Sequence, residues 1–161
     1  MNLKYEYERK RCSAEQAVSD IESDKKVLLC SEPVTLVKAL YEQKERFHPL
    51  YIYSMMGFAN QDIYKRLYDL VAISHFKVAI SYMTRSEANA IKSGIVVDHL
   101  LTHFGYIEEM FQAHIRPDYV LCHVSPMDGE GFFYMGICPG PGRVSIDCGA
   151  KVILQVNKNI P

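Results

Sequence analysis

The sequence predicts an α/β fold with an open, mostly parallel sheet and helices on both faces. Short apolar runs typical of strands buried on both faces alternate with segments whose apolar residues recur at helical spacing. This alternation favours βαβ units, in which a helix crosses from one parallel strand to the next. A chain of 161 residues suits one domain with a sizeable core, so we expect residues 1–161 to form a single α/β domain.

The first half of the chain begins with a helix and a buried strand. Ser13 and Gln16 have the spacing of a capping box, which predicts a helix over residues 13–23. Residues 26–31 form a continuous apolar run, the form expected of a strand buried on both faces. Pro33 then stands near the first turn of a second helix. The next expected elements are a strand at 50–56, a helix at 61–73 with Leu67, Leu70 and Val71 on its apolar face, a strand at 77–81, and a helix that ends near Gly94.

The second half of the chain contains fewer unambiguous patterns. Apolar residues at helical spacing within residues 96–114 indicate a short helix there. Apolar runs predict strands further along, and Gly-Pro-Gly precedes one more helix. The elements expected here are strands at 118–124, 132–137 and 151–156 and a helix at 142–149.

Composition and charge exclude several classes of function. A formal net charge of −1 and a pI near 6.6 give no general electrostatic reason to bind nucleic acid or an anionic membrane. Residues 4–11 alternate in sign, which favours a solvated lead-in over a basic arm. The first apolar cluster begins only at Val27, so no signal peptide is expected, and no apolar run is long enough to span a membrane. We therefore expect a cytoplasmic protein.

The five cysteines, Cys12, Cys30, Cys122, Cys138 and Cys148, form no CxxC pair and have no regular spacing. Their odd number indicates thiols in a reducing compartment, which agrees with a cytoplasmic location. Cys30, Cys122 and Cys138 lie inside apolar runs, where a thiol behaves as a small buried hydrophobe.

Polar residues or chain breaks follow several of the expected strands. The clearest lies within residues 118–136, where a strand ends at Ser125-Pro126 and an acidic, glycine-containing turn follows. The carboxyl ends of parallel strands meet at one edge of the sheet, which is where ligands bind in open α/β folds. The alternative is a plain set of loops between core strands. The candidate substrate-binding residues at this edge are Ser31, Glu32, Gly57, Arg85, Ser125, Pro126 and Asp128.

Other motifs are weaker. Gly140-Pro141-Gly142 follows an apolar run and precedes a helix, but a dinucleotide fingerprint needs a third glycine where Ser145 stands. His99 and His103 are four residues apart, which would place both on one helical face, but the HExxH pattern is absent. We expect neither a metal nor a permanently bound cofactor. Arg85 could meet an anion or could equally be a solvated cap of the helix that follows it.

Several segments together resemble the acetyl-CoA hydrolase/transferase family, which includes 4-hydroxybutyrate CoA-transferase. The similarity begins with the capping box at Ser13 and the run KVLLCSEPVTLVKAL, and it continues through SYMTRSEANAIKSG, which contains Arg85. HVSPMDGEGF is similar to the family's S-P-x-D-x-x-G pattern at Ser125, Pro126, Asp128 and Gly131. The tail, AKVILQVNKNIP, resembles the strand and N-x-x-x-P segment that close the family's N-terminal half.

The resemblance implies one half of a two-domain CoA-transferase, with coenzyme A as a substrate. Acyl-CoA and a short-chain carboxylic acid would exchange CoA through a glutamyl thioester, in two easier steps instead of one hard one. In this family the reactive glutamate and a glycine-rich CoA loop belong to the C-terminal half. The resemblance therefore implies that this chain supplies only the acyl or carboxylate side of the cleft and is inactive alone.

Three interpretations follow. The chain could be the N-terminal half of a larger enzyme, a non-catalytic partner subunit whose complementary half is a separate polypeptide, or a stand-alone module that binds small acyl or carboxylate ligands. In the first two, the face that packs on the other half should be apolar and uncovered, so we expect self-association as a homo-oligomer. The acyl group, and the choice between hydrolase and transferase, are not determined by these patterns.

Overall fold

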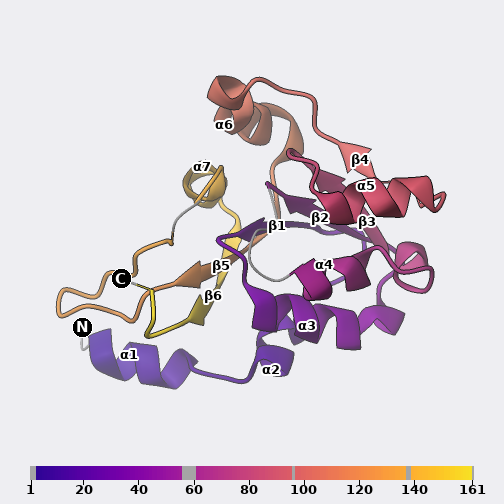
Figure 1. Ribbon diagram of the computed structural model, residues 1–161. Helices are drawn as coiled ribbons and strands as arrows, with labels where there is room; N and C mark the ends of the chain where they lie inside the picture. Colours follow the sequence, from indigo (N-terminus) through magenta and orange to yellow (C-terminus); the bar gives the residue numbers. More distant parts are fainter. Residues whose placement is uncertain (1–2, 56–60, 96, 137–138, 161) are drawn as a thin grey trace.

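The computed structural model describes residues 3–55, 61–95, 97–136 and 139–160 and confirms the predicted fold class. In the described chain, a six-stranded sheet has the order β4-β3-β2-β1-β5-β6, and all five strand pairings are parallel (Figure 1). The strands are β1 Lys26–Cys30, β2 Leu50–Ser54, β3 Phe76–Ile80, β4 Asp98–His99, β5 Tyr119–Val124 and β6 Lys151–Val156.

Helices cover both faces of the sheet, as the sequence predicts. Contacts join α2 to α3, α3 to α4 and α4 to α5 on one face, while α6, η4 and α7 pack on the other. No helix among the described residues has the length and apolar character needed to cross a membrane. The α-helices are α1 Leu3–Lys10, α2 Ala14–Ser19, α3 Val34–Glu42, α4 Gln61–Leu67, α5 Arg85–Lys92, α6 Ile107–Met110 and α7 Gly142–Asp147. Shorter helical turns are η1 Lys44–Arg46, η2 Ala72–Ser74, η3 Phe104–Tyr106 and the π-helical η4 Phe111–Ile115.

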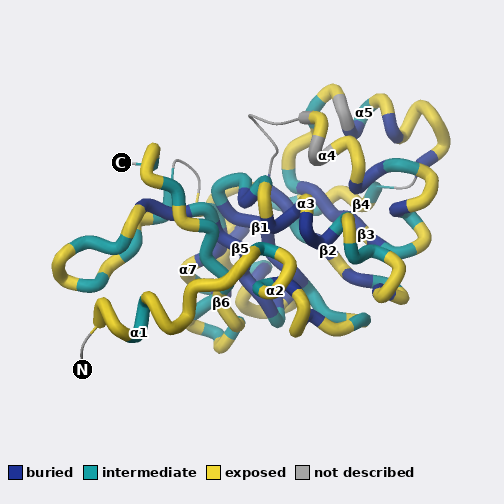
Figure 2. The backbone as a smooth tube through the Cα atoms, turned by 90° about the horizontal axis from the view of Figure 1, so that it is seen from below, coloured by how far each residue is buried: buried dark blue, intermediate teal, exposed yellow. Residues whose placement is uncertain are grey.

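The core lies on both sides of the central strands, which are the most deeply buried part of the chain (Figure 2). On the α3 face, Leu29 and Leu121 pack with Leu40 of the helix, and on the α7 face Leu28 and Val120 pack with Phe111 of η4. Full burial of an aliphatic side chain contributes roughly 1.5–3 kcal/mol. Because consecutive residues of β1 serve opposite cores, a continuous apolar run is the pattern that such a strand requires.

The strand order contains a topological switch between β1 and β5. From β1 the chain adds β2, β3 and β4 on one side, and it then returns to the other side of β1 to form β5 and β6. The register of the central pair runs from Val27 opposite Tyr119 to Cys30 opposite Cys122. In open α/β sheets, ligands bind in the crevice outside the carboxyl ends of the strands at such a switch.

The strand predicted at residues 132–137 was wrong. Only an isolated antiparallel bridge joins Met135 to Val124, and residues 125–136 otherwise form a loop. Hydrogen bonds to the side chains of Ser125 and Asp128 fix this loop, so it needs no further strand pairing. Residues 137–138 lie outside the described part of the chain.

The helix predicted at 61–73 also ends early. In the structure α4 stops at Leu67, and Leu70 and Val71 are 75% and 54% exposed and do not extend its apolar face. The cause is Asp69, whose Oδ1 accepts the N–H groups of Val71 and Ala72 at 3.0 and 2.7 Å. A short carboxylate that bonds its neighbouring backbone in this way starts a new turn, here η2.

Two further segments differ from expectation. Residues 4–11 fall largely in α1, a helix whose Arg9–Glu6 pair and Arg11–Glu8 pair both close at 2.8 Å. The segment is solvated, as predicted, but the Tyr7 ring also contacts Phe133 with centroids 5.7 Å apart, which packs α1 against the loop after β5. Residues 96–114 contain the short edge strand β4 in addition to the expected helix.

Gly142 should be intolerant of alanine. A Cβ built there would lie 2.8 Å from Cys30 Sγ, and that thiol is itself only 2% exposed beneath α7. We expect Gly142→Ala to lower the free energy of unfolding by about 1–3 kcal/mol, the usual cost of overpacking, in urea denaturation followed by circular dichroism.

Gly129→Ala is the matched control, because a Cβ at Gly129 has no atom within 4 Å. The double variant Cys30→Ala/Gly142→Ala should regain part of the loss by making room for the methyl group. Equal unfolding free energies for the two glycine variants would contradict the close packing of α7 on β1.

Candidate functional site at the carboxyl edge of the sheet

Ser31 and Glu32 follow β1 directly and adopt an unusual backbone conformation. Both have φ of +53°, in the left-handed region that residues with a Cβ rarely occupy. The cost is on the order of 1–2 kcal/mol per residue, and such strain persists only where the surroundings impose it. Two consecutive strained residues beside the β1–β5 switch therefore point to a built feature of this edge.

Ser125, directly after β5, is only 4% exposed and organises the loop that follows. Its N–H donates to the Tyr134 carbonyl at 2.9 Å, and its Oγ accepts the Tyr134 N–H at 3.0 Å. The Ser125 hydroxyl in turn donates to the Pro126 carbonyl at 3.0 Å, while Pro126 itself is exposed. The structure thus gives Ser125 a loop-closing role.

Asp128 holds the tip of the same loop. Its Oδ1 accepts the N–H groups of Glu130 and Phe132 at 2.9 and 2.8 Å, and its Oδ2 accepts the Tyr134 hydroxyl at 3.0 Å. The Phe132 N–H in the first place, with smaller contributions from Tyr134 and Glu130, lowers the pKa of the Asp128 carboxyl. A direct contact between Asp128 and a substrate stays a prediction.

Arg85 is the first residue of α5, just beyond the carboxyl end of β3. It is exposed, and it has no hydrogen-bond or ion-pair partner among the residues that the structure describes. Glu87, in the first turn of the same helix, is 3% exposed and accepts both the N–H of Thr84, at 2.8 Å, and its hydroxyl. Arg85 is therefore a cation available to an anion. Gly57 lies outside the described residues.

Contacts between loops gather these residues at one end of the sheet. A Cβ at Gly136 would lie 3.6 Å from Ser31 Cβ, so the loop after β5 touches the strained turn after β1. The Tyr82 N–H donates to the Met55 carbonyl at 3.0 Å, joining the segments that follow β3 and β2. A Cβ at Gly140 would lie 2.9 Å from Met55 Cγ, which brings the turn before α7 onto the same edge.

Two further residues of this edge, Gln155 and His123, are not among the site residues that the sequence predicts. Gln155 of β6 accepts the N–H groups of Thr35 and Leu36 through Oε1 at 2.8 and 3.3 Å, and thereby caps α3, whose own N-cap is Pro33. His123 lies opposite Gln155 in the β5–β6 register. Only strand register reveals this pair, so no sequence motif could have found it.

Two buried polar atoms also stand out at this edge. In the described part of the chain, Ser81 Oγ and His123 Nε2 are the buried side-chain polar atoms without a hydrogen-bond partner. Ser81 directly follows β3, and His123 is the penultimate residue of β5, so both lie at the carboxyl ends of strands. Buried polar groups are normally paired, and an orphan therefore indicates a missing donor or acceptor.

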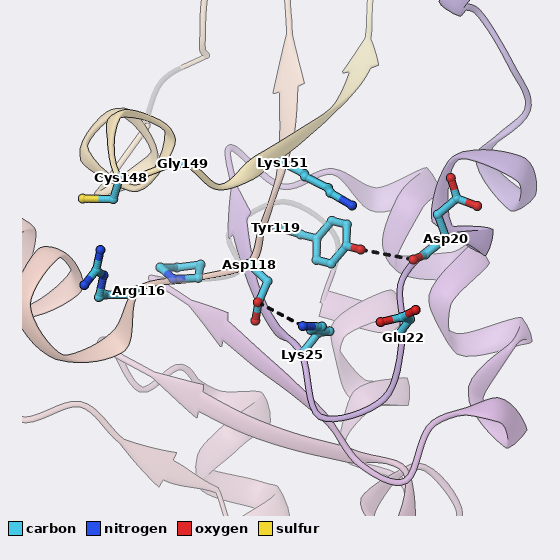
Figure 3. A pocket seen from close by; sticks show the side chains of 10 residues that line it. Asp20, Glu22, Lys25, Arg116, Asp118, Tyr119, Cys148, Gly149 and Lys151 are labelled. Carbon is cyan, nitrogen blue, oxygen red and sulfur yellow. Dashed lines mark hydrogen bonds and ion pairs between the residues drawn. The ribbon is translucent and has the colours of Figure 1, made fainter.

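A hollow of about 400 Å³ lies at the opposite end of the sheet, before the first residues of β1, β5 and β6 (Figure 3). Lys25 Nζ lies 3.5 Å from Asp118 Oδ1, and the Tyr119 hydroxyl donates to the Asp20 carbonyl at 3.1 Å. The residues that line it are Asp20, Glu22, Lys25, Arg116, Pro117, Asp118, Tyr119, Cys148, Gly149 and Lys151.

Electrostatics favour the carboxyl edge over this hollow for an anionic ligand. The acidic and basic side chains of the hollow balance, and the C-terminal ends of α2, η4 and α7 lie at this end of the sheet, where helix carbonyls carry partial negative charge. Basic side chains of the protein already form hydrogen bonds with these carbonyls. Lys26 Nζ donates to the Ile115 carbonyl at 2.7 Å, and Arg46 donates to the Ser19 carbonyl at 2.7 Å. The helices that follow β1, β3 and β5 begin at the other edge, where helix N–H groups carry partial positive charge; Gln155 already accepts two of those of α3, and the Glu87 carboxylate lies in the first turn of α5.

The histidine spacing noted in the sequence does not form a metal site. His99 lies in β4, and His103 precedes η3, where its Nδ1 accepts the Gly105 N–H at 3.1 Å, so the two do not share a helical face. Across the ranges that the structure describes, no group of three or more histidine, cysteine or acidic side chains could hold a metal ion.

Comparison with known proteins identifies the family of this chain. Residues 1–161 match the acetyl-CoA hydrolase/transferase N-terminal domain. The chain belongs to the acetyl-CoA hydrolase/transferase family. It is 28% identical over 159 residues to 4-hydroxybutyrate coenzyme A transferase from Clostridium kluyveri, covering 96% of this chain and 36% of that protein.

Solved structures related to this acetyl-CoA hydrolase/transferase domain share its fold. RipA from Yersinia pestis superposes with a TM-score of 0.90 at 24% identity, over 100% of this chain and 39% of that one. A 4-hydroxybutyrate CoA-transferase from Porphyromonas gingivalis gives a TM-score of 0.68 at 22% identity, over 99% of this chain and 36% of that one. The chain thus spans little more than a third of the length of these relatives.

Asp128 generates a pH-dependent prediction. A carboxyl with a lowered folded-state pKa stabilises the fold fully above its unfolded pKa, roughly 3.9, and loses that contribution as the pH falls through the folded value. We expect Asp128→Ala to lower the urea midpoint at about pH 7, and the difference from wild type to shrink as the pH drops below about 4.

Glu130→Ala is the control for this experiment, because Glu130 is exposed in the same turn and only its backbone N–H bonds to Asp128. A constant difference between wild type and Asp128→Ala across this pH range would show that the carboxylate charge does not organise the loop.

Proposed function

We propose that residues 1–161 form the N-terminal domain of a CoA-transferase that moves CoA between an acyl-CoA and a short-chain carboxylic acid. The match of the whole chain to the family's N-terminal domain carries this proposal. The name of the Clostridium kluyveri relative supports transfer over hydrolysis and an acid of the 4-hydroxybutyrate type, and the name of the matching family supports acetate as the second acid. Coenzyme A is then a substrate and not a resident cofactor.

The chemistry requires a carboxylate that this chain does not supply. A glutamate oxygen attacks the thioester carbonyl, CoA leaves as its thiolate, and a mixed anhydride forms. The thiolate then attacks the glutamyl carbonyl, releases the first acid and leaves a glutamyl-CoA thioester. An incoming acid then takes up the CoA by the same two steps in reverse order, which regenerates the glutamate. Glu87 is engaged with Thr84, and the family resemblance places the reactive glutamate in the C-terminal half, so we assign the nucleophile to a second half of the protein.

The carboxyl edge supplies one wall of the cleft in this scheme. Arg85 is the residue we assign to direct contact, since its exposed guanidinium, which has no partner among the described residues, can hold a substrate carboxylate or a CoA phosphate by two parallel hydrogen bonds. Ser125 and Asp128 act by fixing the loop after β5. Residues proposed to form the substrate side are Ser31, Glu32, Gly57, Arg85, Ser125, Pro126 and Asp128.

A second candidate is a partner subunit whose complementary half is a separate polypeptide. Exposed apolar side chains in two segments, which we call the apolar ridge, favour it. The hydrogen bond from the Leu100 N–H to the Ile80 carbonyl, at 2.7 Å, brings the segment after β4 beside the end of β3. Large exposed apolar areas mark interaction surfaces. The ridge consists of Tyr82, Met83, Leu101, Phe104 and Tyr106, which are 45%, 48%, 84%, 59% and 63% exposed. A stand-alone module for small acyl or carboxylate ligands is the third candidate.

The isolated chain should transfer no CoA. With acetyl-CoA and a panel of short-chain acids, we expect no exchange by the 161 residues alone, because the nucleophilic carboxylate is absent. Exchange is expected once a polypeptide that carries the second half is joined to the chain or purified with it. Turnover by the isolated chain would overturn the proposal, and tight CoA binding to it by calorimetry would favour the binding module.

Within the active assembly, Arg85→Ala should lower kcat/KM by about tenfold or more, equivalent to at least about 1.4 kcal/mol of transition-state stabilisation. Lys92→Ala removes a cation from the last turn of the same helix and should leave kcat/KM unchanged. Equal kcat/KM values for the two variants would remove Arg85 from the substrate-binding wall.

The chain should self-associate through the apolar ridge. Sedimentation velocity is expected to show a concentration-dependent homo-oligomer, and Leu101→Glu should shift it toward monomer by placing a charge in the contact. Leu70→Glu is the matched control, because Leu70 is 75% exposed outside the ridge. A monomer at every concentration, or equal effects of the two variants, would contradict this prediction.

A further inference from the structure

Two cysteines lie side by side at the topological switch. Cys30 is the last residue of β1, Cys122 belongs to β5, and the two are register partners in the parallel ladder. They are 2% and 0% exposed, and both side chains lie in the core on the α7 face of the sheet. Neither is part of a disulfide.

The register places the two Cα atoms opposite each other, at a spacing typical of neighbouring strands, from which a disulfide can form. Neighbouring strands lie about 4.8 Å apart, and disulfides form between residues whose Cα atoms are roughly 4.4–6.8 Å apart. The two side chains also interact: a hydrogen bond with Cys30 lowers the pKa of the Cys122 thiol, against the opposing effect of burial. The thiolate is the reactive form of cysteine, so this contact favours reaction at Cys122.

We propose that Cys30 and Cys122 are an oxidative modification site that closes to a disulfide across the switch point. The oxidant is hydrogen peroxide. The Cys122 sulfur attacks a peroxide oxygen, the O–O bond breaks, and a sulfenic acid and one water form. The Cys30 sulfur then attacks the sulfenic sulfur, the S–O bond breaks, and a second water leaves. Two thiols lose two electrons, and hydrogen peroxide is reduced to two waters.

Oxidation at this position would act on the carboxyl edge. Cys30 immediately precedes the strained Ser31–Glu32 pair, and its Sγ is the atom on which Gly142 of α7 packs. A disulfide would move Cys30 Sγ toward β5 and away from Gly142. This movement would change the conformation of the turn after β1 and the packing of α7 on the sheet. This site goes beyond the proposed function and does not depend on it.

Peroxide would reach the buried thiols through local opening of α7, a helix of six residues that packs on Cys30 through Gly142. Of the other cysteines, Cys12 is exposed and Cys148 lies at the C-terminal end of α7, at the opposite edge of the sheet. Neither is a register partner of the pair.

The test uses the full chain with Cys12, Cys138 and Cys148 replaced by serine, so that only the pair remains. After hydrogen peroxide treatment, denaturation and alkylation with iodoacetamide, intact mass should show a monomer that has lost two hydrogen atoms and carries no alkyl group. Dithiothreitol should restore two alkylatable thiols, and digestion should yield one cross-linked peptide that joins Cys30 to Cys122.

The same chain with Cys30→Ser is the control, and it should give sulfenic or sulfinic products without the loss of two hydrogens. Circular dichroism before and after treatment verifies that the oxidised chain is folded. Two thiols that remain alkylatable, intermolecular dimers on a non-reducing gel, or over-oxidation without cross-linking would each overturn the proposal.

Discussion

The shared direction of the strands is the constraint from which the rest of this structure follows. Parallel strands place all their carboxyl ends at one edge, and each connecting helix must run back, so that the helices after β1, β3 and β5 begin at that edge. The arrangement separates two kinds of environment. Helix N-termini and the exposed Arg85 lie at the carboxyl edge, whereas helix carbonyls at the other edge are matched by Lys26 and Arg46.

Local side-chain chemistry then shapes the carboxyl edge. The loop after β5 is held by Ser125 and Asp128, whose oxygens accept four hydrogen bonds from Glu130, Phe132 and Tyr134. The loop meets Ser31 through Gly136, and Gln155 caps the helix that follows Glu32. The strain at Ser31 and Glu32 is thus enclosed by contacts from both sides, which is the condition under which such strain persists.

The sequence predicted the parts of the molecule that depend on local patterns. Buried strands follow from continuous apolar runs, and the Ser13–Gln16 capping box forms with both hydrogen bonds at 3.2 Å. It failed where a nearby side chain competed with periodicity, as Asp69 does when it ends α4 before Leu70. It could not reach features that depend on register, such as the Gln155 cap or the pairing of Cys30 with Cys122, because register is set by tertiary packing.

The candidate edge is also where the described chain is least satisfied internally. Ser81 Oγ and His123 Nε2 are buried without partners, and each such group costs roughly 1–3 kcal/mol if it stays unpaired. Arg85 and the exposed ridge that includes Leu101 lie at the same end. At the opposite edge, where the strands begin, the acidic and basic side chains balance. The carboxyl edge instead combines buried polar atoms without partners, an exposed arginine and exposed apolar side chains, which are features of an interaction surface. The chain spans 36% of its Clostridium kluyveri relative, and under the proposed function this edge is the wall that the second half of such an enzyme would complete.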